Sequence, residues 1–243
     1  MDTETGTLYV VPTPIGNLED MTPRAITVLN HVSMVACEDT RVSGQLFAHF
    51  GITARKVSYH DHNERGRTPE LLVRLQSGDD VALVSDAGTP GVSDPGFFLV
   101  RAAIELGIPV DVLPGANALL PALVGSGLPC DRFVFEGFLP TKKGRQTRLR
   151  ALAEETRTIV IYESPHRVVR TLAELRDIVG PERSVCVCRE LTKKFQEYIR
   201  GAISEVHDVL LAREKIKGEC VIVVAGADAK TRSRRTADDD LTH

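Results

Sequence analysis

The chain has 243 residues, of which 42% are hydrophobic and 26% are charged, and its formal net charge is −3 at pH 7. This composition is ordinary for a globular protein, and it excludes one that attracts nucleic acid through a strong overall positive field. No apolar run approaches the roughly 20 residues of a transmembrane helix, and the acidic start Met1-Asp-Thr-Glu4 is unlike a signal peptide. The five cysteines form no C-x-x-C pair, so we expect reduced thiols and a cytoplasmic protein without a membrane partner.

The first half of the chain alternates short apolar runs with helical patterns. Residues 81–84, Val-Ala-Leu-Val, form a continuous apolar run that is typical of a strand buried on both faces. Similar strands are expected at residues 8–11, 32–37, 56–59 and 110–113, and helices at 23–30, through 46–50, around 69–75, at 97–106 and from 114 to about 124. Five strands alternating with five helices predict an α/β fold with a mostly parallel, doubly wound sheet.

Three helix boundaries carry recognisable signals. Thr22 and Pro23 are an N-cap and first-turn pair, and Gly51 is placed to end the helix that precedes it. Asp94 and Pro95 are placed to cap and start the helix at residue 97.

A second alternating set follows the hinge-like sequence Gly125-Ser-Gly-Leu-Pro129. Strands are expected at residues 132–136, 158–162, 184–190, 195–200 and 219–224, and helices at 142–155 and after 167 to 179. The strands at 184–190 and 195–200 are candidates for a hairpin. We therefore expect an N-terminal α/β domain at 1–127, a C-terminal α/β domain at 128–226, and a polar, disordered tail at 227–243.

Polar or glycine-rich residues follow each strand of the first set, so they should gather at one edge of the sheet. In open α/β sheets, ligands bind at the carboxyl ends of the strands. The loop at residues 85–96 is rich in Gly and Pro, which let the main chain approach a ligand closely, although tight turns have the same composition. There is no P-loop, no G-x-G-x-x-G and no G-x-S-x-G, and His60-x-His62 is only weak evidence for a metal. Such loops suit a ligand that lacks phosphate groups and carries an adenosine and a small zwitterion.

Nine short motifs occur together and in order along the chain. They are Val11-Pro-Thr-Pro-Ile-Gly-Asn-Leu18, Glu38-Asp-Thr-Arg41, His60-Asp-His-Asn-Glu64, Ser85-Asp-Ala-Gly-Thr-Pro90, Leu113-Pro-Gly115, Glu136-Gly-Phe-Leu-Pro140, Tyr162-Glu-Ser-Pro-His-Arg167, Arg189-Glu-Leu-Thr-Lys193 and Lys217-Gly-Glu219. Over roughly residues 6 to 226, the chain resembles the ribosomal RNA small-subunit methyltransferase I family. These are the cytidine 2′-O-methyltransferases of 16S rRNA in the tetrapyrrole methylase superfamily, also called class III methyltransferases.

The resemblance implies two α/β domains with S-adenosylmethionine in the cleft between them, and a homodimer. It also implies that the substrate is 16S rRNA within the assembled small ribosomal subunit. The expected cofactor contacts are Pro14, Gly16, Asp86, Ala87, Gly88, Pro90, Pro114, Gly115, Phe138, Leu139, Tyr162 and Gly218. Among these, Pro114-Gly115 is expected at a helix N-terminus, where free amides can receive the methionine carboxylate. The aromatic side chains are expected to wall the adenine, and ordinary core packing is the alternative.

A ribose 2′-hydroxyl is a poor nucleophile unless a base removes its proton. Candidate bases are His60, Asp61, Asp39, Glu64 and Glu163, with a preference for His60 and Asp61. Each of them can instead serve as a helix cap or pair with an arginine. Residues 142–150 hold five basic residues and form the best local patch for an RNA backbone, a solvated helix face being the alternative. The expected RNA contacts are Arg41, Lys142, Lys143, Arg145, Arg148 and Arg167.

Two other functions remain open at this point. A tetrapyrrole-ring methyltransferase of the same superfamily would use the same cofactor, but it gives no reason for the basic segment at 142–150. A non-catalytic ribosome-assembly factor that kept the fold would tolerate damage to the cofactor loops, which are intact in this sequence.

Overall fold

The computed structural model describes residues 5–227. Within them the chain divides into two compact units, with the division between Asn117 and Ala118. We call the part before the division unit 1 and the part after it unit 2. The tail expected at 227–243 lies, apart from Ala227, outside the described residues.

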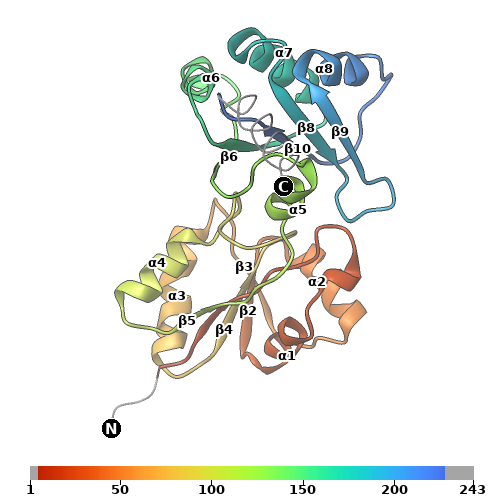
Figure 1. The fold of residues 1–243 in the computed structure, drawn as a ribbon. Helices are drawn as coiled ribbons and strands as arrows, with labels where there is room; N and C mark the ends of the chain where they lie inside the picture. The colour runs from red at the N-terminus through yellow and green to blue at the C-terminus, as the bar shows by residue number, and fades with distance from the viewer. Residues whose placement is uncertain (1–4, 228–243) are drawn as a thin grey trace, which may run out of the picture. The chain divides into compact units, whose positions relative to one another are not determined.

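Unit 1 is a single parallel sheet with helices on both faces (Figure 1). Its elements are β1 (Leu8–Val10), η1 (Leu18–Asp20), α1 (Pro23–His31), β2 (Met34–Cys37), α2 (Thr40–Phe50), β3 (Lys56–Ser58), α3 (Glu64–Gln76), β4 (Val81–Val84), α4 (Phe97–Glu105) and β5 (Val110–Val112). The strand order is β3-β2-β4-β1-β5, and every neighbouring pair is parallel. The expected doubly wound sheet is therefore confirmed.

The alternation of side chains along β4 explains why helices cover both faces of this sheet. Ala82 and Val84 belong to the core cluster that also contains residues of α1 and α2. Val81 and Leu83 belong to the opposite cluster, with residues of α3 and α4. Successive residues of a strand point to opposite faces, so a strand covered on both sides has no polar position, as the run Val-Ala-Leu-Val indicates.

Two of the predicted helix boundaries in unit 1 are confirmed. The hydroxyl of Thr22 accepts a hydrogen bond from the Ala25 N–H at 3.1 Å, and Pro23 is the first residue of α1. Gly51 ends α2 in the left-handed conformation, with φ 66°, which costs glycine little.

Unit 2 holds a second sheet of mixed direction. Its elements are α5 (Leu119–Ser126), β6 (Phe133–Phe138), α6 (Arg145–Ala153), β7 (Thr158–Glu163), α7 (Val168–Val179), β8 (Ser184–Arg189), β9 (Glu197–Ala202), α8 (Ile203–Leu211) and β10 (Cys220–Val224). The order is β6-β7-β10-β8-β9, in which β6 and β7 are parallel and the other neighbours are antiparallel. The expected hairpin is confirmed as β8–β9, which pairs from Ser184 with Ala202 to Arg189 with Glu197.

Helices cover both faces of the second sheet as well. The main core cluster combines residues of α6, α7 and α8 with one side of β7, β8 and β10. Helix α5 packs against β10 and β8. We expected the division of the chain after Gly127, but α5 belongs by its packing to unit 2, which moves the division to Asn117. Helix α8 was not expected from the sequence.

Candidate functional site

The loops that follow β1 and β4 are joined at the carboxyl edge of the unit 1 sheet. The backbone N–H of Thr13 donates to the Gly88 carbonyl at 2.9 Å, and the Gly88 N–H donates to the Thr13 carbonyl at 2.8 Å. The Thr13 hydroxyl also donates to the Ser85 carbonyl at 3.0 Å. Gly88 has φ +86°, so the close pairing relies on a residue without a Cβ. These contacts bring the Pro14 loop against the Ser85–Pro90 loop.

The loops after β2 and β4 are joined by two carboxylates. The Asp86 N–H donates to Glu38 Oε2 at 3.1 Å, and the Asp39 N–H donates to Asp86 Oδ1 at 3.0 Å. Each loop thus supplies a carboxylate to a backbone amide of the other. This reciprocal pair fixes the position of Asp86, one of the predicted cofactor contacts.

A third carboxylate, Asp94, was not among the predicted site residues. Burial, and then the negative charge of Glu38, raise the pKa of Asp94 to about 7. Burial also raises the pKa of Glu38 and that of Asp86. Asp61 raises the pKa of both Asp94 and Glu38, which places the loop after β3 near the same carboxylates. Perturbed carboxyl groups gathered at one sheet edge are typical of functional sites.

The expected capping role of Asp94 is wrong. Helix α4 begins at Phe97, its N-cap is Gly96 with φ 145°, and that cap makes no side-chain hydrogen bond. Gly96 lies against Leu83, where a Cβ would come within 2.9 Å of Cδ2. The carboxylate of Asp94 instead interacts with the Ser85 hydroxyl.

The expected place of Pro114-Gly115 at a helix N-terminus is also wrong. Helix α5 begins at Leu119, and residues 113–117 have no regular structure. Pro121 lacks a backbone N–H and fits only the first turn of a helix, which a start at Leu119 provides. Gly115 instead lies tightly against Pro12, where a Cβ would come within 2.7 Å of the proline Cβ.

A pocket of about 380 Å³ opens beside the joined loops of unit 1. It is lined by Pro14, Gly16 and Asp86, all predicted cofactor contacts, and by residues of α2. The neighbouring Ala87 is exposed, whereas Gly88 and Pro90 are buried. Exposed main chain and carboxylates therefore lie side by side at the carboxyl edge of the unit 1 sheet.

The predicted bases of unit 1 differ in their surroundings. Asp39 caps α2 and pairs with Arg41 at 2.6 Å, and the hydrogen bonds from Arg41 hold its pKa well below the usual range. In the turn after β3, His60 Nδ1 accepts from the His62 N–H at 3.3 Å. No ion pair joins Asp61 to a residue within 5–227, and Glu64 is likewise without one there.

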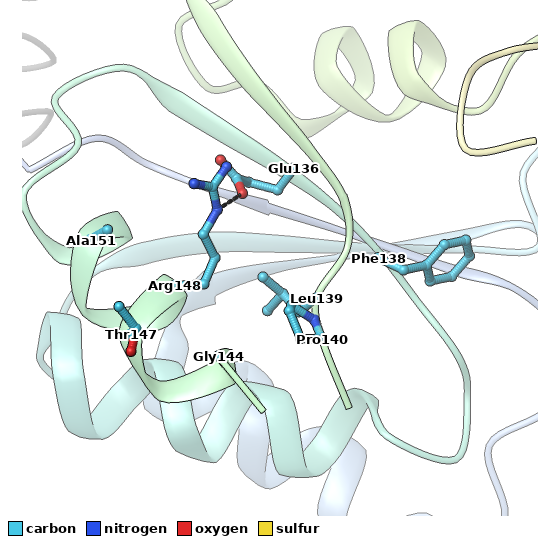
Figure 2. A pocket seen from close by; sticks show the side chains of 8 residues that line it. All are labelled: Glu136, Phe138, Leu139, Pro140, Gly144, Thr147, Arg148 and Ala151. Carbon is cyan, nitrogen blue, oxygen red and sulfur yellow. Dashed lines mark hydrogen bonds and ion pairs between the residues drawn. The ribbon is translucent and has the colours of Figure 1, made fainter. Parts of the chain in front are cut away.

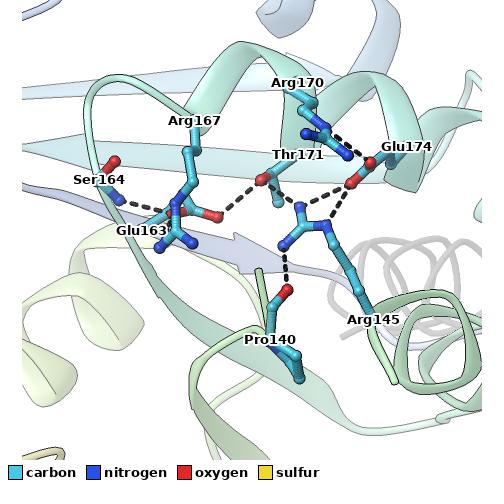
Figure 3. A network of polar contacts seen from close by, with 8 residues as sticks. All are labelled: Pro140, Arg145, Glu163, Ser164, Arg167, Arg170, Thr171 and Glu174. Atoms are coloured by element: carbon cyan, nitrogen blue, oxygen red, sulfur yellow. Dashed lines mark hydrogen bonds and ion pairs between the residues drawn. The ribbon is translucent and has the colours of Figure 1, made fainter. Parts of the chain in front are cut away.

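Glu163 of unit 2 belongs to a buried network and is not an accessible base (Figure 3). Its side chain is fully buried, pairs with Arg167 at 2.8 Å, and accepts from the Thr171 hydroxyl at 2.7 Å. Thr171 also accepts from Arg145 Nη2 at 2.8 Å, and Arg145 pairs with Glu174 at 2.7 Å. The network thus runs from β7 through α7 to α6.

The expected RNA contact at Arg145 is wrong, because Arg145 is only 4% exposed. It lies on the inward face of α6 with Leu149 and Leu152, and its Nη1 donates to the Pro140 carbonyl at 3.1 Å. Arg167 is committed to Glu163, and the exposed Arg41 is paired with Asp39. The predicted RNA contacts at Lys142 and Lys143 are exposed.

A second pocket, of about 500 Å³, lies between β6 and α6 (Figure 2). Phe138 and Leu139, two predicted cofactor contacts, help to line it, and the remaining lining includes Glu136 and Arg148. Arg148 Nε donates to Glu136 at 2.5 Å. The side chain of this predicted RNA contact is therefore already paired with a carboxylate of the protein. Tyr162 packs edge-on against Phe138, with ring centroids 5.8 Å apart.

The last predicted cofactor contact, Gly218, packs against the carboxylate of Glu190. A Cβ at Gly218 would come within 2.2 Å of Glu190 Oε1. Lys193 pairs with this carboxylate at 3.0 Å and with Glu219 at 2.8 Å. Within residues 5–227, no group of three or more His, Cys, Asp or Glu side chains could hold a metal ion, and no helix there is long and apolar enough to cross a membrane.

Comparisons with known proteins agree on one family. The sequence profile of the family described as Tetrapyrrole (Corrin/Porphyrin) Methylases matches residues 7–207. A Synechocystis protein named ribosomal RNA small subunit methyltransferase I is 54% identical, over 93% of this chain and 81% of its own. The Escherichia coli O157:H7 protein of the same name is 48% identical, over 94% and 81%. The structure of Thermus thermophilus uroporphyrin-III C-methyltransferase complexed with S-adenosylhomocysteine is similar in fold, with a TM-score of 0.62 and 22% identity over 90% of this chain and 97% of that one.

Proposed function

The chain belongs to the ribosomal RNA small subunit methyltransferase I family of the tetrapyrrole methylases, and from this premise we propose that it methylates a cytidine ribose 2′-oxygen of 16S rRNA. The methyl donor is S-adenosylmethionine, and the substrate is the assembled small ribosomal subunit. The observation that carries the proposal is the identity of about half of all residues over more than nine-tenths of the chain. We infer further that the enzyme acts in the cytoplasm, where ribosomes are assembled, and as a homodimer.

The carboxyl edge of unit 1 fits the cofactor in charge and in shape. S-adenosylmethionine carries two positive charges, on its sulfonium and its ammonium, and the carboxylates of Glu38 and Asp86 lie together at this edge. Gly115 leaves its main chain exposed and so close to Pro12 that a side chain would not fit. Asp86, Ala87 and Gly88 would hold the cofactor, with Pro14 and Gly16 across the pocket. Phe138, Leu139, Tyr162 and Gly218 of unit 2 stay predictions.

The cofactor supplies a methyl group on a sulfonium, which is already a good leaving group. The chain must therefore position the ribose and accept the proton of its 2′-hydroxyl. Asp39 and Glu163 are poor choices for the base, since each carboxylate is bound to an arginine and a backbone N–H. His60 and Asp61 remain the preferred candidates, because their turn lies near Glu38 and Asp94 without an arginine partner.

The direct test is methyl transfer to three substrates. The purified chain and S-adenosylmethionine are incubated with unmethylated small subunits, with free 16S rRNA, and with uroporphyrinogen III. We expect 2′-O-methylcytidine, detected by mass spectrometry of the digested RNA, on the subunits and far less on free RNA. Methylation of the tetrapyrrole alone would replace the proposed function by the alternative within the same superfamily.

A further inference from the structure

The first turn of α4 presents two aromatic rings to solvent. Phe97 is 62% exposed and Phe98 is 39% exposed, and their ring centroids lie 6.2 Å apart at 74°. Helix α4 directly follows the loop that carries Asp94, so these rings lie at the same sheet edge as the carboxylates. Phenylalanines this exposed bury less apolar surface on folding than core residues do, and two adjacent ones at a functional edge indicate a surface that contacts something flat and apolar.

A guanidinium lies against one of these rings. The Cζ of Arg65, in the first turn of α3, is 5.0 Å from the centroid of the Phe98 ring. Arg65 is exposed, and no ion pair joins it to an acidic side chain within residues 5–227. Its neighbour Arg67, by contrast, is paired with Glu70 at 2.6 Å. The positive charge of Arg65 is thus held beside an exposed ring and is not neutralised.

Aromatic rings combined with arginine are what proteins use to hold unpaired nucleobases. Every base has a flat π-face that stacks on a phenylalanine or on a guanidinium plane. The nearby Asp61 and Asp94 would repel phosphates, so this edge does not bind RNA through a basic groove. Stacking needs no phosphate contact, and the planar guanidinium of Arg65 offers a further surface on which a base can stack.

We propose that Phe97, Phe98 and Arg65 form a stacking platform for an unpaired base of the RNA substrate, next to the site of methyl transfer. This inference rests on the proposed function and names the surface by which the substrate is held there. The bound base is either the target cytosine or a flanking nucleotide, and both share the chemistry of an unstacked π-face. A nucleotide held at this edge would bring its ribose to the strand-end carboxylates.

The test compares single substitutions on α4 in the full chain. Phe97→Ala and Phe98→Ala remove one ring each, whereas Phe97→Trp keeps a stacking surface. Ile104→Ala is the matched control, because Ile104 is 61% exposed on the same helix but near its other end. Methyl transfer to unmethylated small subunits gives KM and kcat, and calorimetry gives the affinity for S-adenosylmethionine without RNA.

We expect Phe97→Ala and Phe98→Ala to raise KM for subunits about ten-fold, as loss of one stacked base predicts. Phe97→Trp should stay near the wild type, and so should Ile104→Ala. Affinity for S-adenosylmethionine should be unchanged in all four variants. A purely structural role would instead lower cofactor affinity as well and would not be rescued by tryptophan.

Three results would overturn the platform. If the ring-deletion variants match Ile104→Ala in KM while the wild type methylates subunits, the proposed function stands and the platform fails. If they change only the oligomeric state in sedimentation, the rings form a contact between copies of the chain. A wild type that binds S-adenosylmethionine but methylates no subunits removes the proposed function, and the platform falls with it.

Discussion

Glu38 and Asp86 hold the ends of two neighbouring strands together: the backbone N–H of Asp86 donates to Glu38 Oε2 at 3.1 Å. Asp86 in turn accepts from the N–H of Asp39 at 3.0 Å. A hydrogen bond to a charged group contributes about 1.5–3 kcal/mol, enough to decide the position of a loop of a few residues. The loop that we propose to hold the cofactor is therefore positioned by a residue that need not touch the cofactor.

The first prediction concerns this positioning. Glu38→Ala removes the acceptor and should weaken S-adenosylmethionine binding about ten-fold or more, since the Asp86 loop loses a fixed conformation. Glu38→Gln keeps an oxygen that can accept from Asp86 and should bind more tightly than Glu38→Ala. Calorimetric titration of both variants measures the difference. If both variants bind S-adenosylmethionine equally and more weakly than the wild type, the charge of Glu38 matters and the hydrogen bond does not.

A second prediction follows from the raised pKa of Asp94. Its pKa is about 7 in the folded chain and near 3.8, the usual value of an aspartate, when the chain is unfolded, so the folded state binds more protons between these values. Stability therefore falls through this group as pH rises from about 4 to about 7. Asp94→Asn should remove this pH-dependent loss of stability. The free energy of unfolding of the variant should therefore exceed that of the wild type by more at pH 8 than at pH 5.

Urea unfolding at the two pH values measures this gain, with the exposed Asp131→Asn as control. The same gain at pH 5 and pH 8 would show that Asp94 does not titrate in this range.

The third prediction tests the buried network of unit 2. Arg145→Ala leaves Glu174 with only the exposed Arg170 as an ionic partner and should lower the free energy of unfolding by about 3–5 kcal/mol. Arg150→Ala, on the exposed face of the same helix, should change it by less than about 0.5 kcal/mol. Similar losses in the two variants, measured by urea unfolding, would contradict the assignment of Arg145 to the interior.

A fourth prediction separates RNA contact from stability in the basic segment. Lys142→Ala combined with Lys143→Ala should leave unfolding unchanged, because both side chains are exposed. If these lysines contact phosphates, the variant should bind small subunits more weakly and with a shallower dependence on salt, by about one to two units of the log–log slope. Filter binding at several salt concentrations measures the slope. If the variant binds more weakly but its log–log salt slope equals that of the wild type, the lysines do not contact phosphates.

The sequence predicts the ten strands of residues 5–227, and it predicts the buried ones most clearly because an unbroken apolar run marks their burial. Val81–Val84 is covered on both faces, and four consecutive apolar residues indicate this without knowledge of the rest. Gly51 and Thr22 likewise mark helix ends through local chemistry. Such features depend on neighbours in the chain, which a pattern can show.

The wrong predictions concern residues whose surroundings are set by residues far away in the sequence. Asp94 precedes a helix as a cap would, but Gly96 packs on Leu83 and the carboxylate lies among charges from two other strand ends. Arg145 stands in a basic run, although its spacing to Leu149 and Leu152 follows the inward face of α6 and could have indicated burial. Its partner Glu174 lies in another helix, and no local pattern reveals it.

The central claim is that the strand-end edge of unit 1 holds the cofactor for RNA methylation, and Gly88 tests it most directly. Gly88→Val forces a β-branched residue to φ +86°, a backbone conformation that such residues rarely adopt, and this strain should break the pairing with Thr13. Gly66→Ala is the control, because its position is open and has no positive φ. The measurement is 2′-O-methylcytidine formed on unmethylated small subunits, alongside calorimetric binding of S-adenosylmethionine. We predict that Gly88→Val loses both while Gly66→Ala keeps both; a folded Gly88→Val variant with wild-type methylation and binding would contradict the claim.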